Sequence, residues 1–142
     1  MNEMLLIQDD AGVGRAMGRL LLANDYDRLT WIGGVSSTDL IDGALQGLDI
    51  RRHPLLVNLS DYVLAFVDGN LKIGVAQGWT LVPILRQAGI ICIGMSTIYG
   101  ERLQQSGVEH VVDPLQFMPF IEKHLAGIYK NACARRNRTP AA

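Results

Sequence analysis

The sequence has few of the residues and segments that mark secreted, membrane-bound or nucleic-acid-binding proteins. Its two cysteines, Cys92 and Cys133, lack metal-type spacing, and nothing indicates a disulfide framework. The apolar runs are much shorter than the ~20 residues that span a membrane, and no signal segment opens the chain. A net charge of −1 gives no strong field toward nucleic acid or an anionic membrane. These absences predict a cytoplasmic protein without a direct nucleic-acid or membrane partner.

What the sequence does contain is an alternation of short apolar runs and amphipathic segments. With 142 residues, 49% of them hydrophobic, the chain can bury one core. We expect strands at residues 4–7, 29–32, 62–67, 90–95 and 108–112, and helices at residues 11–23, 38–45, 79–88, 99–106 and 117–128. The segment 48–60 is expected to be a loop with a short local element.

This strict alternation predicts parallel strands joined by crossover helices on both faces of a sheet. The predicted fold class is α/β: a flavodoxin-like (βα)5 three-layer sandwich with a five-stranded parallel sheet in the order 2-1-3-4-5. In this order the first and third strands are neighbours at the centre. Their carboxyl ends form the crevice where ligands bind in open α/β sheets.

Three carboxylates follow these two central strands. Asp9 and Asp10 come after the first strand, and Asp68 ends the apolar run 62–67. Carboxylates that converge in this crevice repel one another unless a cation lies among them, and oxygen ligands of this kind suit Mg²⁺. Taken singly, each has a structural explanation as well. Asp9 or Asp10 fits a helix N-cap, and Asp68 fits the start of an Asp-Gly turn.

Together with the residues around them, these carboxylates resemble a known family, the CheY-like receiver domain of bacterial two-component response regulators. The resemblance implies that Asp9 and Asp10 are the acidic pair for Mg²⁺ and that Asp68 is the phosphoacceptor. It also implies that Asn70 offers a backbone carbonyl to the metal and that Ser96 is the switch hydroxyl. Ser96 has the equally open alternative of capping the helix that follows.

The resemblance covers most of the chain, from about residue 4 to residue 125. It divides the sequence into a receiver domain, residues 1–132, and a basic C-terminal tail, residues 133–142. We interpret the arginines of this tail as a frayed, solubilising end. The tail is too short to be an output domain, so we expect a stand-alone receiver or the receiver piece of a longer protein.

The main departure from the family is Asp113, because the family has a lysine there that pairs with the phosphoryl oxygens. A phosphoryl group on Asp68 would then face a like charge, which predicts weakened switching. Asp113 followed by Pro114 also fits a helix start, and we favour this capping interpretation. The family's aromatic switch position is His110, which we expect to be a half-buried strand residue. Lys72 stands where the family has a proline.

The resemblance implies a response-regulator receiver domain in phosphorelay signal transduction, with Mg²⁺-dependent phosphorylation at Asp68. It further implies weakly bound Mg²⁺, a sensor histidine kinase or phosphotransfer protein as partner, and a downstream protein target. No enzyme activity is expected beyond self-phosphorylation from a phosphodonor and autodephosphorylation.

Two alternatives remain at this stage. The first is a phosphorylation-independent pseudo-receiver, a protein–protein interaction module that could form a homodimer through its last helix. The second is a flavodoxin-like nucleotide or flavin binder, prompted by Gly12, Gly14 and Gly18 after the first strand. The spacing of these glycines is off by one from a dinucleotide loop, so we interpret them as helix-packing and loop residues.

Overall fold

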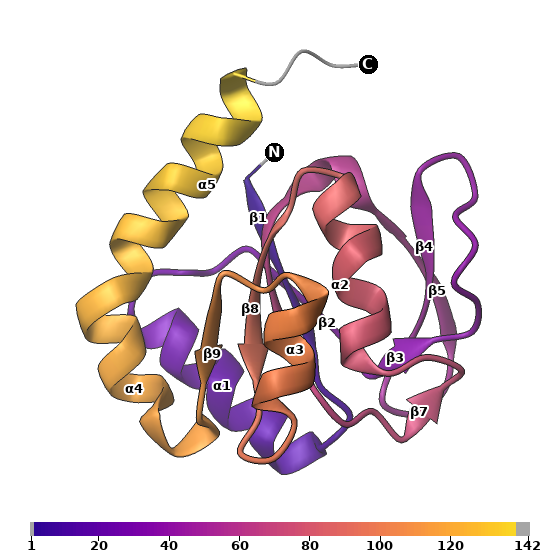
Figure 1. Cartoon of the computed structure of the whole chain (residues 1–142), viewed down its shortest axis with the longest axis horizontal. Coiled ribbons are helices and arrows are strands. Elements are labelled where there is room, and N and C mark those ends of the chain that lie inside the picture. The colour runs from indigo at the N-terminus through magenta and orange to yellow at the C-terminus, as the bar shows by residue number, and fades with distance from the viewer. Residues whose placement is uncertain (1, 139–142) are drawn as a thin grey trace.

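The computed structural model describes residues 2–138. At its centre is a parallel sheet with helices on both faces (Figure 1). The five strands, in spatial order, are β2 (Leu29–Ile32), β1 (Glu3–Ile7), β6 (Tyr62–Asp68), β8 (Ile91–Met95) and β9 (His110–Val112). All neighbouring pairs run parallel, so the predicted order 2-1-3-4-5 and the predicted fold class are confirmed.

The helices cover both faces of the sheet, with the first helix and the C-terminal helices on one face and the two middle helices on the other. These helices are α1 (Ala11–Ala23), α2 (Gly78–Gln87) and α3 (Gly100–Ser106), followed by a C-terminal helical segment. That segment starts as the 3-10 turn η2 (Pro114–Gln116), continues through α4 (Phe117–Phe120) and a wider π-helical turn (Ile121–Leu125), and ends as α5 (Ala126–Arg138). No helix in the described part of the chain is long and apolar enough to cross a membrane.

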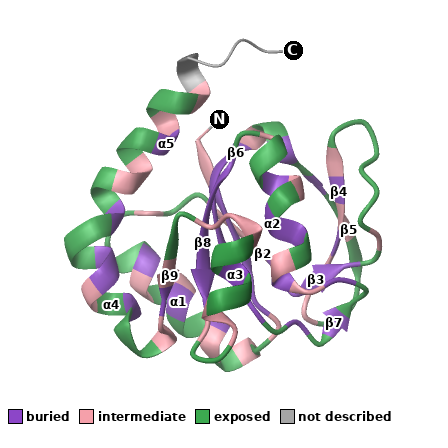
Figure 2. Cartoon of the chain, in the orientation of Figure 1, coloured by how far each residue is buried: buried purple, intermediate pink, exposed green. Residues whose placement is uncertain are grey.

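The core has two halves, one on each face of the parallel sheet (Figure 2). Side chains alternate along a strand, so Leu5 of β1 packs in one half and Leu6 in the other. The half with Leu6 is covered by α1 and the C-terminal helices, and the half with Leu5 by α2, α3 and a β-hairpin. Residues 62–67 of β6 are buried throughout, which explains their continuous apolar sequence.

The β-hairpin replaces the second predicted helix, so the prediction of a helix at residues 38–45 is wrong. In its place the chain forms β3 (Gly34–Val35), β4 (Ala44–Leu48) and β5 (Pro54–Asn58). Together with β7 (Ile73–Gly74), these strands make a second sheet in the order β5-β4-β3-β7. The segment 48–60, predicted as a loop, contains the hairpin turn, β5 and the 3-10 turn η1 (Leu59–Asp61).

Local chemistry explains the hairpin. Gly43, at φ +78°, and Gly47 disfavour a helix, while Leu45 and Val57 alternate with exposed or half-exposed residues and pack into the core. The Asp49 carboxylate closes the turn by accepting hydrogen bonds from the amides of Arg51 and His53, at 2.8 and 2.9 Å. The alternation of strand and helix is therefore broken once, between β2 and β6.

The C-terminal helix continues past residue 133, where the sequence predicted a separate basic tail. Ala132 is buried, and the Arg135 guanidinium pairs with the Glu109 carboxylate at 2.9 Å. The Arg136 guanidinium donates to the backbone carbonyls of Leu59 and Tyr62 at the start of β6. These contacts hold α5 against the sheet as far as Arg136. Residues 139–142 of the predicted tail lie outside the described residues, and the division of the chain at residue 133 stays a prediction.

Candidate functional site

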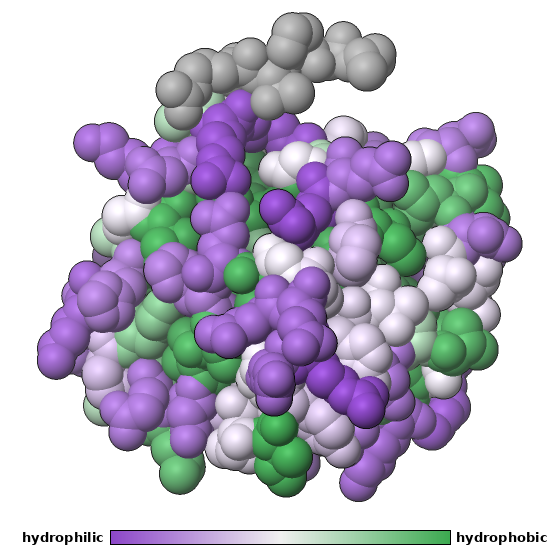
Figure 3. Space-filling view, viewed as in Figure 1, coloured by the Kyte–Doolittle hydropathy of each residue, from purple (hydrophilic) through white to green (hydrophobic). Residues whose placement is uncertain are grey.

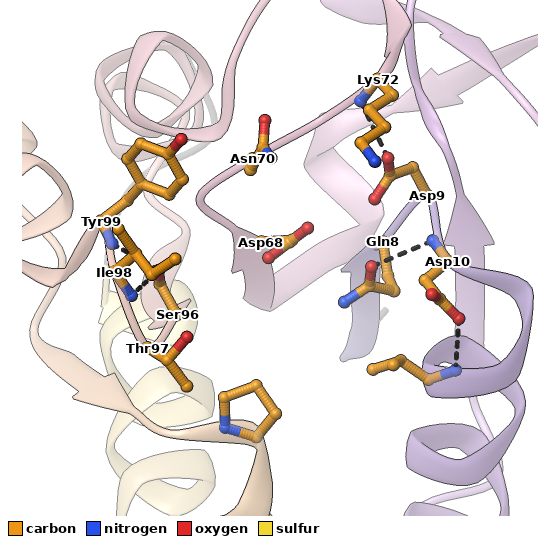
Figure 4. A pocket seen from close by; sticks show the side chains of 12 residues that line it. Gln8, Asp9, Asp10, Asp68, Asn70, Lys72, Ser96, Thr97, Ile98 and Tyr99 are labelled. Carbon is orange, nitrogen blue, oxygen red and sulfur yellow. Dashed lines mark hydrogen bonds between the residues drawn. The ribbon is translucent and has the colours of Figure 1, made fainter.

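A pocket of about 400 Å³ lies at the carboxyl ends of β1, β6 and β8, at the switch point of the parallel sheet (Figure 4). Its lining consists of Gln8, Asp9, Asp10, Val13, Asp68, Asn70, Lys72, Ser96, Thr97, Ile98, Tyr99 and Pro114. The structure therefore brings every residue predicted for the site to one pocket. Asp113, the residue predicted to disturb it, is not among the lining residues.

Asp68 is the last residue of β6 and lies half-buried in the middle of this pocket. Burial is the largest cause that raises the pKa of Asp68 to about 7, and the nearby Asp9 carboxylate contributes by charge repulsion and as a hydrogen-bond acceptor. The backbone amides of Asn70 and Gly69 act in the opposite direction. Near neutral pH, Asp68 is therefore protonated in a substantial fraction of molecules unless a cation enters the pocket.

Asp9 connects the end of β1 to the loop after β6. Its Oδ2 accepts a hydrogen bond from the backbone amide of Lys72 at 2.8 Å (Figure 4). This contact holds the Lys72 main chain at the edge of the pocket. Asp9 is half-buried and faces Asp68, as expected for one member of the predicted acidic pair.

Asp10 has a structural task instead. Its Oδ1 accepts from the amide of Val13 at 3.0 Å and caps α1, as the capping interpretation predicted. The sequence reading missed Gln8, which is only 4% exposed and accepts from the Asp10 amide through Oε1 at 3.0 Å. The Gln8 carbonyl also accepts from the Trp31 indole at 2.8 Å. A polar residue that directly follows a buried strand was the signal that could have identified Gln8.

Ser96 lies on the opposite side of the pocket, after β8 (Figure 4). Its hydroxyl oxygen accepts from the amides of Ile98 and Tyr99, at 3.1 and 2.7 Å. Ser96 thus closes the turn that precedes α3, but the N-cap position of α3 is Tyr99 and no side chain caps this helix, so the capping alternative for Ser96 is wrong. Its switch role stays a prediction.

Asp113 caps η2, because its Oδ1 accepts from the Leu115 amide at 2.9 Å. It lines a different cavity, together with His110 and His124, on the far side of β9. Asp113 was predicted to place a like charge against a phosphoryl group on Asp68. Because it lines the other cavity, its charge is not directed into the pocket that contains Asp68. His110, predicted to be half-buried, is exposed, and its ring centroid lies 6.1 Å from that of Phe120.

The pocket is suited to Mg²⁺ only in part. Asp9 and Asp68 supply two carboxylates, which is the number that Mg²⁺ commonly takes from a protein alongside waters. Asp10 is occupied as a helix cap, and no group of three or more His, Cys, Asp or Glu side chains within residues 2–138 is arranged to hold a metal ion. The facing carboxylates of Asp9 and Asp68, with Asp10 and Asn70 also lining the pocket, are what this chain offers a cation here.

The glycines that prompted the nucleotide-binding alternative all lie within α1. A Cβ on Gly14 would come within 2.1 Å of the Trp31 ring, so this glycine permits close packing of α1 on β2. The packing interpretation is therefore confirmed for Gly14, while a Cβ on Gly12 or Gly18 would meet no backbone or ring at such short range.

The similarity of this chain to known proteins concerns its fold. No protein-family model and no curated protein sequence matches this chain. Among solved structures, a signal receiver domain from Vibrio parahaemolyticus aligns with TM-score 0.63 and 12% identity, over 99% of this chain and 98% of that one. A Burkholderia pseudomallei response regulator with a phosphorylated aspartic acid, calcium ion and citrate aligns with TM-score 0.59 and 12% identity, over 100% of this chain and 77% of that one.

A third similar structure is the response regulator DrrB, an OmpR/PhoB homolog from Thermotoga maritima. It aligns with TM-score 0.58 and 9% identity over 90% of this chain, which spans only 54% of the length of DrrB. The chain therefore has the fold of response-regulator receiver domains.

Proposed function

We propose that this chain is a phosphorylatable receiver domain of a two-component signalling system, with Asp68 as its phosphoacceptor. The observation that carries the proposal is the position of Asp68, half-buried at the end of the central strand and facing Asp9 in an open pocket. The receiver fold supports it, and so does the phosphorylated aspartic acid of the similar Burkholderia protein. A sensor kinase or phosphotransfer protein would act as the donor, and a downstream protein would read the phosphorylated state.

In the proposed reaction, an ionised oxygen of Asp68 attacks the phosphorus of a phosphohistidine or of an acyl phosphate. The bond from phosphorus to the donor breaks, the donor leaves with the electron pair, and an acyl phosphate forms on Asp68. Asp9 and Asp68, with the Asn70 carbonyl, would hold Mg²⁺, which neutralises charge on the phosphoryl oxygens when it is bound. Because the pKa of Asp68 is about 7 without a cation, a bound cation would also keep Asp68 ionised.

Two further residues have roles in this proposal. Lys72 is the only cationic side chain that lines the pocket in the described part of the chain, so it would pair with the phosphoryl oxygens in place of the lysine that the family has at Asp113. Ser96 accepts two backbone hydrogen bonds through its oxygen, which leaves its own O–H free to donate to a phosphoryl oxygen. Closing this turn and switching are therefore compatible for Ser96.

The test is incubation of the full chain with Mg²⁺ and acetyl phosphate, followed over time by intact-mass spectrometry. The wild type should gain the mass of one phosphoryl group, and Asp68→Ala should gain none. Asp113→Asn is the matched control, because Asp113 lies outside the pocket and Asn also caps helices. It should be labelled like the wild type. Lys72→Ala should be labelled more slowly or lose the group faster.

A second candidate is the phosphorylation-independent pseudo-receiver. It is favoured by Asp113 in place of lysine and by the capping role of Asp10, which leaves only two carboxylates facing each other. An unlabelled wild type with native circular dichroism would select this candidate and exclude the first. Partner binding would then be equal for the wild type and Asp68→Asn, with or without the phosphodonor.

A further inference from the structure

Strand β5 is the outer strand of the second sheet, where it pairs only with β4 among the described residues (Figure 1). An edge strand presents unpaired backbone groups, and proteins usually protect such an edge with charges, bulges or a covering segment. The sequence of β5 is Pro-Leu-Leu-Val-Asn, which carries no charge. Pro54 protects only the first position of β5, so the backbone groups of the rest of the strand are available for pairing with another strand.

The hydrogen bonds of the hairpin show which backbone groups of β5 point outward. The Asp49 amide donates to the His53 carbonyl at 2.9 Å, and the Leu59 amide donates to the Gly43 carbonyl at 3.3 Å. In an antiparallel ladder the bonded pairs recur at every second residue, so the odd-numbered residues 53–59 bond to β4. The even-numbered residues Pro54, Leu56 and Asn58 therefore direct their backbone groups away from β4.

Exposed apolar side chains lie on β5 and in the segment between β3 and β4. Leu56 is 63% exposed at the middle of β5. Leu40 and Ile41, which precede β4, are 42% and 47% exposed. Figure 3 shows hydrophobic surface on the side of the molecule where Figure 1 places the hairpin. Burial of these side chains would favour association.

The two ends of β5 carry opposite net charges, because two arginines outnumber Asp49 in the turn before β5. Arg51 and Arg52 lie in the turn before β5, and both are exposed. Asp61 follows β5 in η1, and Asp42 lies at the same end, just before β4. An antiparallel copy of this strand would place the basic end of one molecule beside the acidic end of the other. A parallel copy would place like charges together, so the charges favour the antiparallel arrangement.

We propose that two copies of this chain associate through their β5 edges, antiparallel about a twofold axis at Leu56. In this register Leu56 of each copy donates to, and accepts from, Leu56 of the other. The Asn58 amide of each copy donates to the Pro54 carbonyl of the other. Every outward N–H of β5 then has an acceptor, and the N–H that proline lacks is not needed. The two second sheets would become one continuous sheet across the dimer.

The first experiment is sedimentation equilibrium of the full chain. We expect the wild type to dimerise, and Leu56→Lys to raise the dimer dissociation constant about tenfold or more, because two like charges would meet at the axis. Leu115→Lys is the matched control, since Leu115 is 84% exposed in η2 and lies outside the hairpin. It should dimerise like the wild type. A wild type that stays monomeric at about 1 mM, or a Leu56→Lys dimer of wild-type strength, would overturn the proposal.

A charge exchange tests the register and remains informative if Leu56→Lys does not fold. Arg51→Asp alone should weaken the dimer, because it places an acidic residue beside Asp61 of the second copy. The double variant Arg51→Asp, Asp61→Arg should restore wild-type association. Equal weakening by the single and the double variant would exclude this register. A monomer that binds an extended peptide along β5 would identify another protein as the occupant and overturn the self-pairing.

Discussion

Replacement of Asp68 by asparagine should stabilise the folded chain, and the gain should depend on pH. Burial and Asp9 raise the pKa of Asp68 from its ordinary 3.8 to about 7. A group whose pKa is raised on folding contributes stability that is complete below its unfolded pKa and is lost as the pH rises through its folded pKa. Wild-type stability should therefore fall from about pH 4 to about pH 7, and the asparagine variant should lack this loss.

The pKa difference sets the size of the effect. At about 1.4 kcal/mol per pKa unit, it corresponds to about 4 kcal/mol for a group fully shielded from water. Because Asp68 is only half-buried, solvent screening reduces the expected gain to roughly 1–2 kcal/mol. Urea unfolding in metal-free buffer at several pH values, followed by tryptophan fluorescence, measures this difference. Asp68→Asn should exceed the wild type most at the highest pH.

A control variant and the response of stability to Mg²⁺ test whether the effect comes from Asp68. Asp113→Asn removes a carboxylate that lies outside the pocket, so its difference from the wild type should not grow between about pH 4 and pH 8. Added Mg²⁺ should stabilise the wild type at high pH and leave Asp68→Asn unchanged, because a ligand stabilises only the state that binds it. A gain for Asp68→Asn that does not depend on pH would show that burial and Asp9 do not raise the pKa of Asp68 on folding.

Two packing predictions can be checked by the same urea titrations. Gly14→Ala should cost about 1–3 kcal/mol, because its Cβ would lie 2.1 Å from the Trp31 ring. Gly18→Ala, whose Cβ would meet nothing closer than 3.8 Å, should instead stabilise α1 by about 0.4–1 kcal/mol, and equal losses for both would contradict the packing. Arg136→Leu should cost about 1–3 kcal/mol, since carbonyls near the start of β6 lose their donor. Arg135→Leu, which removes an exposed ion pair, should cost less than about 1 kcal/mol.

The parallel sheet was predictable because its strands appear in the sequence as short, continuous apolar runs. Residues 62–67 have no polar residue among them, and only a strand buried on both faces uses such a run. Asp68 was predictable for the same reason, because a carboxylate that directly follows a central strand must lie at the ligand-binding edge. Which of Asp9 and Asp10 caps α1 was not predictable, because both residues precede this helix and either could cap it.

The hairpin could not be predicted from its own residues. Leu40, Ile41, Ala44 and Leu45 satisfy a helical repeat, and the alternation of Leu45 and Gly47 into the core is visible only once β3 and β7 are in place. The pairing of β4 with its neighbouring strands therefore outweighed the weak helical pattern in its sequence. Asp113 illustrates a different limit. Asp113 follows the short strand β9, and the backbone direction there decides which of two cavities its side chain lines. This direction cannot be inferred from the position of Asp113 in the sequence.

The close contact between β3 and β7 limits where residues can be inserted into this chain. A Cβ on Gly34 would lie 2.0 Å from the Ile73 carbonyl oxygen, and a Cβ on Gly74 would lie 2.1 Å from the Val35 carbonyl oxygen. The two paired backbones thus leave no room for a side chain at either glycine, directly after the loop that carries Asn70. An insertion in that loop would have to displace the second sheet or the pocket. Insertions in the turn between β4 and β5 should leave the pocket intact, because they would interrupt only the hydrogen bonds by which Asp49 closes this turn.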